Sequence, residues 1–120
     1  MKTIFSLFLL FSTVAFSPII DDKGYAIGDV ATDFKLENID GNFVSLSDFK
    51  QAKGFIIVFT CNTCPYAVAY EDRIEALNKE YAPKGYPVIA IMPNNVQSKP
   101  GDSMTAMQKR AKEKGFTFPY

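Results

Sequence analysis

Residues 54–70 read GFIIVFTCNTCPYAVAY and contain both cysteines of the chain, Cys61 and Cys64. The run at 54–60 is apolar without polar alternation, a pattern typical of a central strand buried on both faces. After Cys64 the apolar residues recur every three or four positions, which predicts an amphipathic helix over 65–82. The stretch therefore predicts a buried strand, a two-cysteine turn and a helix in direct succession.

The predicted helix begins and ends at residues suited to those places. Pro65 fits the first turn, where a missing N–H costs nothing, and Pro83 with Gly85 ends the helix. Glu75 and Lys79 have the spacing of an exposed i,i+4 ion pair. The apolar face is formed by Ala67, Tyr70, Ile74, Leu77 and Tyr81.

Further elements follow towards the end of the chain. PVIAIM at 87–92 predicts a second buried strand, and a helix is predicted over 103–114, with Asp102 as its cap and Gly115 at its end. FTFPY at 116–120 is interpreted as the start of another strand. Alternation of strand and helix predicts βαβ crossovers, hence an α/β fold with a mainly parallel sheet flanked by helices.

Before the central strand, a hairpin is expected. The apolar segments 34–36 and 43–46 flank Asp-Gly-Asn at 40–42, which is a hairpin turn signal. Ser47 and Asp48 are then expected to cap a single helical turn.

The start of the chain has the pattern of a targeting signal. Residues 1–17, MKTIFSLFLLFSTVAFS, place a lysine before an apolar run too short to span a bilayer, which predicts a secretory signal peptide. Residues 18–120 are predicted to form one domain. Because an apolar final segment leaves a strand edge and a sheet face uncovered, this domain is expected to be truncated at its C-terminus. The alternative is a short domain that pairs its open edge with another copy.

The composition excludes several classes of function. Lys plus Arg and Asp plus Glu are both 13, so no net charge attracts nucleic acid or an acidic membrane surface. Histidine is absent, which removes Cys-His and Ser-His pairs and most zinc sites. No cofactor or metal is expected. Copper(I) held by the cysteines with Met92, Met104 or Met107 is a weaker alternative, because methionines are more often core residues.

The cysteine pair carries the predicted chemistry. The free N–H groups and the positive end of a helix stabilise a thiolate and lower its pKa. A thiolate attacks a disulfide, and a second cysteine close by in the motif reaches the mixed disulfide and releases the product. We assign Cys61 as the nucleophile, more exposed in the turn, and Cys64 as the resolving thiol; the reverse assignment stays open. An inert disulfide is disfavoured, because closing so short a loop removes little chain entropy.

Several polar residues are placed to support this pair. Asn62 and Thr63 lie between the cysteines and are expected to tune the thiolate through hydrogen bonds and turn shape. Asn94 and Asn95 follow the second strand, whose carboxyl end lies at the same sheet edge as the cysteines. They form either a rim that contacts a partner or a turn after the preceding proline. The supporting residues predicted are Thr60, Asn62, Thr63, Pro65, Asn94 and Asn95.

Most of the chain after residue 26 resembles one superfamily. The blocks are IGDVATDFKL (27–36), DGNFVSLSDF (40–49), FIIVFTCNTCPY (55–66) and PVIAIMPNN (87–95). They resemble the AhpC/TSA and thioredoxin-like superfamily, specifically its peroxiredoxin-like thioredoxin-domain branch, and the block at 61–66 is the most specific. The resemblance implies a thioredoxin-like fold with Cys61 and Cys64 as the redox pair.

The sequence departs from the family pattern in three ways. Thr60 stands where thioredoxins usually have tryptophan, and the preceding strand has no acid to act as the buried proton acceptor. In peroxiredoxins a threonine lies three residues before the peroxidatic cysteine; Cys61 holds that position relative to Cys64, so a peroxidase would need Cys64 to attack. The family's cis-proline would lie beyond Tyr120, and Pro119 has the context of an ordinary turn proline.

These features together predict a thiol:disulfide oxidoreductase, exported to the periplasm or cell envelope of a bacterium. Its expected partners are protein disulfides or an electron-donor thiol protein. We expect no nucleic-acid binding and no stable membrane insertion after signal cleavage. The alternatives are a peroxiredoxin-like thiol peroxidase in which Cys64 attacks and a non-enzymatic module that handles copper(I) or docks a partner.

Overall fold

The computed structural model describes residues 24–120, and the predicted signal peptide at 1–17 lies outside the described residues. The chain divides into two compact units, Met1–Ala31 and Thr32–Tyr120. In the first unit the described residues contain a turn in which the N–H of Asp29 donates to the carbonyl of Ala26. Every helix and strand assigned within residues 24–120 belongs to the second unit. None of the described helices is long and apolar enough to cross a membrane.

The second unit starts with the predicted hairpin. β1 (Leu36–Glu37) pairs antiparallel with β2 (Phe43–Val44). Gly41 in the loop between them has a φ of 81°, a left-handed conformation that glycine adopts without a steric cost. The hairpin prediction is confirmed.

A short 3-10 turn, η1 (Leu46–Asp48), follows β2, and its cap differs from the prediction. Ser45 is the N-cap, and its N–H donates to the carboxylate of Asp48 at 2.8 Å. Ser47, which the sequence predicts as a cap, lies inside the turn. The helical turn thus begins two residues earlier than its polar residues suggest.

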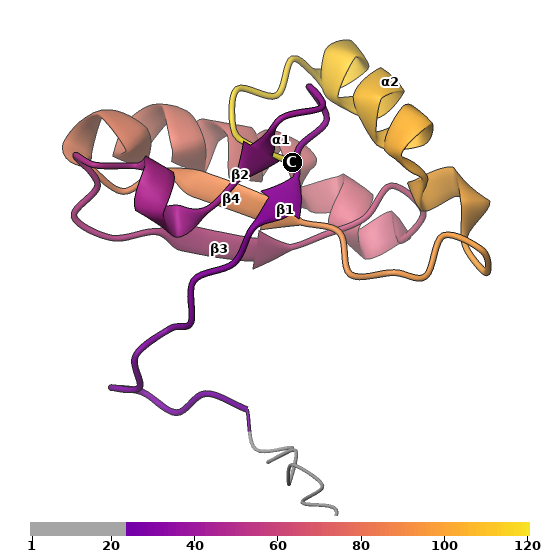
Figure 1. Ribbon diagram of the computed structural model, residues 1–120. Coiled ribbons are helices and arrows are strands. Elements are labelled where there is room, and N and C mark those ends of the chain that lie inside the picture. Colours follow the sequence, from indigo (N-terminus) through magenta and orange to yellow (C-terminus); the bar gives the residue numbers. More distant parts are fainter. Residues whose placement is uncertain (1–23) are drawn as a thin grey trace, which may run out of the picture. The chain divides into compact units, whose positions relative to one another are not determined.

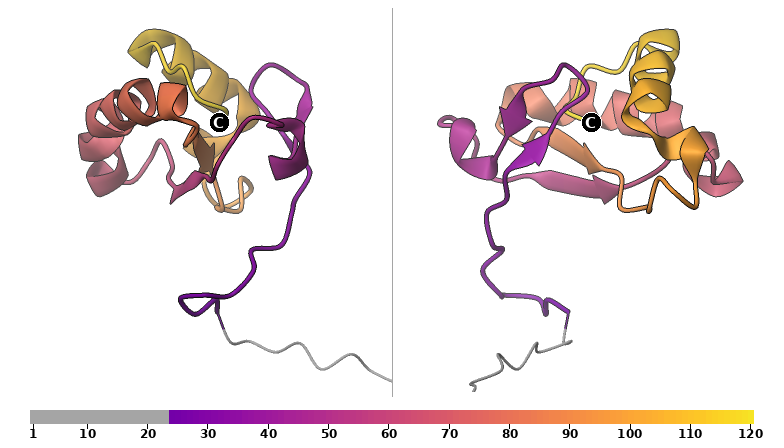
Figure 2. Two further views of the ribbon diagram at one scale, coloured as in Figure 1. Left: turned by 90° about the vertical axis from the view of Figure 1, so that its left-hand side faces the viewer. Right: turned by 45° about the vertical axis from the view of Figure 1, so that its right-hand side comes forward.

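The next elements form the parallel unit that the sequence predicts. β3 (Ile56–Phe59) pairs in parallel with β4 (Val88–Ile91). The connection between them is α1 (Pro65–Tyr81) and the 3-10 turn η2 (Ala82–Lys84). Figures 1 and 2 show α1 on one side of this two-stranded sheet and the β1–β2 hairpin on the other. The turn that contains Cys61 and Cys64, the dithiol turn, therefore lies between the carboxyl end of β3 and the start of α1.

The two strands differ in burial. In β4 Val88, Ile89 and Ala90 are buried, as predicted. In β3 the side chains of Ile57 and Phe59 are 37% and 70% exposed, so the prediction of a strand buried on both faces is wrong. The alternate side chains of β3, Ile56 and Val58, pack against the core, so one face of β3 is covered and the face with Ile57 and Phe59 meets solvent.

The second long helix is α2 (Met104–Lys114), preceded by the 3-10 turn η3 (Pro100–Asp102). Ser103, and not Asp102 as predicted, is its N-cap; the Ser103 hydroxyl accepts the N–H of Ala106 at 3.4 Å. Gly115 ends α2 with a φ of 67°, as the sequence indicates.

Residues 116–120 are not a strand, contrary to the prediction. The N–H of Ala90 donates to the carbonyl of Pro119, and the N–H of Ile39 donates to the carbonyl of Tyr120. The N–H of Tyr120 also donates to the side chain of Asn38, so this segment joins β4 to the loop of the hairpin through separate hydrogen bonds instead of a ladder. No peptide bond among residues 24–120 is cis, so the bond before Pro119 is trans.

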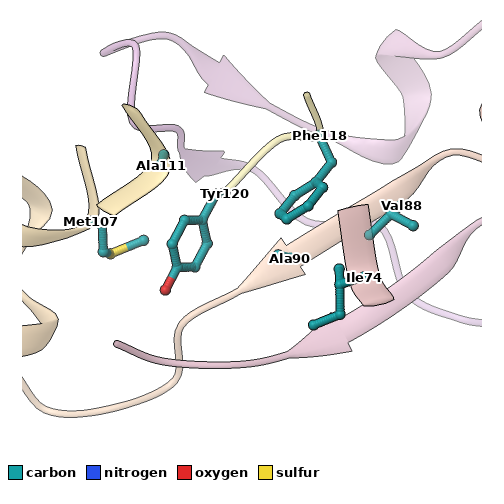
Figure 3. Close-up of a cluster of buried hydrophobic side chains, with 7 residues drawn as sticks. All are labelled: Ile74, Val88, Ala90, Met107, Ala111, Phe118 and Tyr120. Carbon is teal, nitrogen blue, oxygen red and sulfur yellow. The ribbon is translucent and has the colours of Figure 1, made fainter. Parts of the chain in front are cut away.

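The core of the second unit lies between α1, α2, β4 and the segment 116–120. Its buried side chains come from all four elements (Figure 3), and the ring of Tyr120 lies beside Met107 of α2. The cluster consists of Ile74, Val88, Ala90, Met107, Ala111, Phe118 and Tyr120.

Polar side chains of α1 are buried as well, which the helical periodicity does not indicate. Glu71, Glu75 and Asn78 are 4%, 7% and 7% exposed. Glu75 pairs with Lys79 at 3.2 Å, so the predicted ion pair is present, but its carboxylate is buried instead of exposed. Glu71 binds both the Nε and the Nη2 of Arg110 at 2.7 Å and so ties α1 to α2.

Candidate functional site

The two cysteines lie where β3 ends and α1 begins. Thr60 is buried, and its N–H donates to the carbonyl of Ile91 at 3.0 Å, which fixes the start of the turn. Cys61 and Cys64 are half-buried free thiols. Cys64 is the N-cap of α1, and Pro65 occupies the first turn as predicted. The structure therefore brings both sulfurs to the N-terminal end of a helix of 17 residues.

The helix start lowers the pKa of the Cys64 thiol. The backbone N–H groups of Ala67 and Tyr66 in the first turn favour the thiolate, and the Cys61 side chain acts in the same direction. Partial burial and the negative charge of Asp102 act in the opposite direction but do not outweigh these donors. Free N–H groups in the first turn of a helix are unpaired within the helix, so a thiolate satisfies them.

A buried carboxylate holds the two residues between the cysteines, and the sequence does not reveal it. Asp102 is 0% exposed. Its Oδ1 accepts the backbone N–H of Asn62 at 2.8 Å and of Thr63 at 3.0 Å, and its Oδ2 accepts the Thr63 hydroxyl at 2.9 Å. A third residue, Asn94, donates its side-chain amide to Oδ2 at 2.8 Å. Asp102 thus has hydrogen bonds from four donors.

Asn62 forms three hydrogen bonds with residues from later parts of the chain. Besides its backbone bond to Asp102, its side-chain amide donates to the carbonyl of Gly101 at 3.1 Å. Its side-chain oxygen accepts the hydroxyl of Tyr120 at 2.9 Å. The hydrogen bonds of Asn62 therefore hold the turn between the cysteines, and the tuning of the thiolate by Asn62 stays a prediction.

Tyr120 is a second neighbour of the dithiol that the sequence does not reveal. It is 5% exposed. Burial raises the pKa of its hydroxyl, and negative charge at Asp102 and Cys61 raises it further. The hydroxyl therefore stays protonated at neutral pH and acts as a hydrogen-bond donor to Asn62.

The two asparagines after β4 are separated by the structure. Asn94 reaches the site, because its side chain binds Asp102. Asn95 is exposed, and its Oδ1 accepts the N–H of Gln97 at 2.9 Å within a local turn. The turn interpretation therefore describes Asn95, while Asn94 belongs to the group of side chains around the dithiol.

No group of three or more histidine, cysteine, aspartate or glutamate side chains within residues 24–120 has a metal-binding arrangement. Of the methionines considered for copper(I), Met107 is buried in the core, and the sulfur of Met92 accepts the N–H of Asn94 at 3.1 Å. A hollow of about 420 Å³ lies between residues 49–53 and 82–87 and includes neither cysteine.

A strand, a dithiol turn and a helix joined in a parallel unit define a thioredoxin-fold protein. A thiol:disulfide interchange protein of the thioredoxin family from Chlorobium tepidum superposes with a TM-score of 0.61 at 20% identity, covering 74% of this chain and 56% of that one. Residues 27–120 match the model of the AhpC/TSA family, and the chain belongs to that family. The predictions of family and of a thioredoxin-like α/β fold are confirmed.

Two relatives are named as redox proteins. The thiol-disulfide oxidoreductase ResA of Oceanobacillus iheyensis is 35% identical over 75 residues, which are 59% of this chain and 38% of the relative. The putative peroxiredoxin bcp of Helicobacter pylori is 32% identical over 72 residues, 60% of this chain and 47% of the relative. The chain thus spans less than half the length of these relatives, and its family is consistent with oxidoreductase or peroxidase activity.

Proposed function

We propose that this protein is a thiol:disulfide oxidoreductase that cycles between the Cys61–Cys64 dithiol and disulfide on protein substrates. The observation that supports this most is the position of the two free, half-buried thiols at the start of α1, where helix N–H groups lower the pKa of Cys64. Both cysteines are free, and they are separated by only two residues at the start of the helix, which is the spacing of a redox-active dithiol.

The exchange has two steps. The Cys61 thiol transfers its proton to the neighbouring Cys64 thiolate, and the Cys61 thiolate attacks one sulfur of the substrate disulfide. The substrate's other sulfur leaves as a thiolate and takes up the Cys64 proton. The Cys64 thiolate then attacks Cys61 in the mixed disulfide and releases the second substrate sulfur. The substrate gains two electrons and the protein becomes a disulfide, which an electron-donor thiol protein reduces again. A lowered pKa at Cys64 suits the resolving role, because its thiolate re-forms readily.

The same lowered pKa favours a second candidate, a thiol peroxidase. Here the Cys64 thiolate attacks a peroxide oxygen, the O–O bond breaks, and the leaving oxygen is protonated to an alcohol or water. The Cys61 thiol then condenses with the Cys64 sulfenic acid, which forms the disulfide and releases water. The oxidised protein needs the same electron-donor thiol as in the first proposal.

Two assays on the reduced protein distinguish these functions. We expect reduction of insulin disulfides that is lost in both Cys61→Ser and Cys64→Ser, with a mixed disulfide trapped on Cys61 in Cys64→Ser. Trapping on Cys64 in Cys61→Ser alone would reverse the assignment of roles. The second proposal would replace the first if two results were found together. The wild type would not reduce insulin, and rapid consumption of hydrogen peroxide would persist in Cys61→Ser. Ser98→Ala, in the exposed turn after β4, is the control variant and should leave both activities unchanged.

We also propose that the protein is exported, with residues 1–17 removed as a signal peptide. The support is the lysine followed by an apolar run. Expression of the full chain in a bacterium should place a shortened form in the periplasmic fraction, with an N-terminus near residue 18 by sequencing. A chain that stays in the cytoplasm with Met1 intact would refute this.

A further inference from the structure

We propose that Asp102 is a positioning residue for the dithiol: it tethers the Asn62-Thr63 turn and sets how readily Cys64 forms a thiolate. This inference rests on the proposed redox function of the cysteine pair and adds a residue from outside the motif to its machinery. Asp102 touches neither sulfur through a hydrogen bond in the structure, so it acts through the turn and through its charge.

The tether is supported by the geometry of four short contacts. Both backbone N–H groups of the turn, from Asn62 and Thr63, converge on the same oxygen of Asp102 within 3.0 Å. A carboxylate that binds two successive N–H groups fixes the backbone between them, because neither peptide can rotate without losing a bond. The Thr63 hydroxyl and the Asn94 amide occupy the other oxygen. The turn that separates the sulfurs is therefore anchored to η3.

The donors also keep Asp102 charged. Burial alone would raise the pKa of this carboxyl, but the hydrogen bonds from Asn94 and Thr63 and from the turn N–H groups hold it below its usual range. A buried charge with no cationic partner needs such a complete set of donors. At neutral pH Asp102 is thus a fixed negative charge next to the dithiol.

That charge opposes ionisation of Cys64, because two negative charges repel each other. The other titratable groups around the pair are Cys61 in the same turn and Tyr120 from the C-terminal segment, and Tyr120 reaches the turn only through Asn62. The first turn of α1 contains no acidic residue. Within residues 24–120, Asp102 is therefore the main negative charge, apart from the cysteines, that acts on Cys64.

The test uses the full 120-residue chain with Asp102→Asn and Asp102→Ala. Asparagine keeps an oxygen that accepts the turn N–H groups but removes the charge, whereas alanine removes both. The readout is the rate of iodoacetamide modification of Cys64 against pH, resolved by peptide mass spectrometry. Both variants should move the midpoint for Cys64 to lower pH, by about half a pH unit for the loss of one nearby charge.

Asp72→Asn is the matched control, because Asp72 is an exposed carboxylate on α1 that pairs with Lys114. An unchanged Cys64 midpoint in Asp102→Asn, or an equal change in Asp72→Asn, would overturn the inference. A shifted midpoint in a protein that reduces neither insulin nor peroxide would leave the inference standing and refute the proposed function. The two failures are therefore distinguishable.

A measurement on the wild type covers the case in which the Asp102 variants do not fold. The amide protons of Asn62 and Thr63 should exchange slowly with solvent, because both donate to the buried carboxylate. Exchange at the rate of a free turn would show that the tether does not exist in solution. In a folded Asp102→Asn these two amides should remain protected, and in Asp102→Ala they should lose protection.

Discussion

A β-carbon on Gly101 would lie 2.6 Å from Cγ2 of Thr63. Thr63 cannot turn this methyl group away freely, because its Oγ1 sits on the same carbon and donates to Asp102. We therefore expect Gly101→Ala to lower the free energy of unfolding by about 1–3 kcal/mol, as overpacking in a rigid environment does. Urea denaturation followed by circular dichroism measures this change.

A double variant tests whether this contact is the cause. Thr63→Ser removes Cγ2 but keeps the hydroxyl, so it should restore most of the stability lost in Gly101→Ala. Gly24→Ala is the control, because a β-carbon there would meet no atom within 4 Å and the φ of Gly24 is not in the left-handed range. If the double variant is no more stable than Gly101→Ala, the contact with Cγ2 of Thr63 is not the cause of the lost stability.

Tyr120→Phe removes the hydroxyl that binds Asn62 and leaves the ring in place. We expect a loss of about 1 kcal/mol in the free energy of unfolding, because the side-chain oxygen of Asn62 loses a partner in a partly buried place. Tyr86→Phe, at a tyrosine that is 40% exposed, should change stability by less than about 0.5 kcal/mol. Equal losses in the two variants would contradict a specific role for the Tyr120 hydroxyl.

Arg110→Gln breaks the two-point ion pair between α1 and α2. Glu71 is then left buried, and within residues 24–120 its remaining cationic partner is Lys114 at 3.6 Å. The expected loss is about 2 kcal/mol, because a buried charge without its partner carries its desolvation penalty. Lys109→Gln, which breaks a surface pair of 3.8 Å on the same helix, should cost under about 0.5 kcal/mol by the same urea titration.

Stability should fall in acid because of two carboxylates. Burial would raise the pKa of Glu75, but hydrogen bonds from Thr117 and Lys79 hold it below its usual value, and the pKa of Asp102 is lowered as described above. A carboxyl with a lower pKa in the folded state stabilises the fold above its unfolded pKa. That contribution is lost as the pH falls below about 4 towards the folded pKa.

Urea midpoints at pH 7, 5, 4 and 3 measure this effect. Glu75→Gln should reduce the loss of stability between pH 5 and pH 3, since a neutral amide does not titrate. Asp72→Asn should leave the slope close to that of the wild type, because its side chain is 85% exposed. A slope unchanged in Glu75→Gln would show that other groups control the acid transition.

The strand, dithiol turn and helix could be predicted because each depends on local pattern. Single residues set two of the helix ends: α1 starts at Pro65, and α2 ends at Gly115. The parallel pairing of β3 and β4 follows from the helix between them. The prediction failed for Ile57 and Phe59, whose exposure depends on which segments cover the sheet, and an apolar run carries no information about that.

The role of Asp102 could not be predicted from local pattern. An aspartate just before a helix has the properties of an N-cap, and Ser103 beside it has the same properties. What distinguishes the two is that the partners of Asp102 at Asn62 and Thr63 lie 40 and 39 residues earlier in the chain. The burial of Glu71 on α1 could not be predicted for the same reason, since its partner Arg110 lies 39 residues later, on α2.

The bonds of Tyr120 have a consequence for how the chain folds. Its N–H binds the side chain of Asn38 across 82 residues, and its hydroxyl binds Asn62 across 58. Closing loops of this length is entropically costly, so such contacts form late in folding. The hydroxyl bond that holds Asn62 from the far end of the chain therefore forms near the end of folding, after the local helix start that lowers the pKa of Cys64.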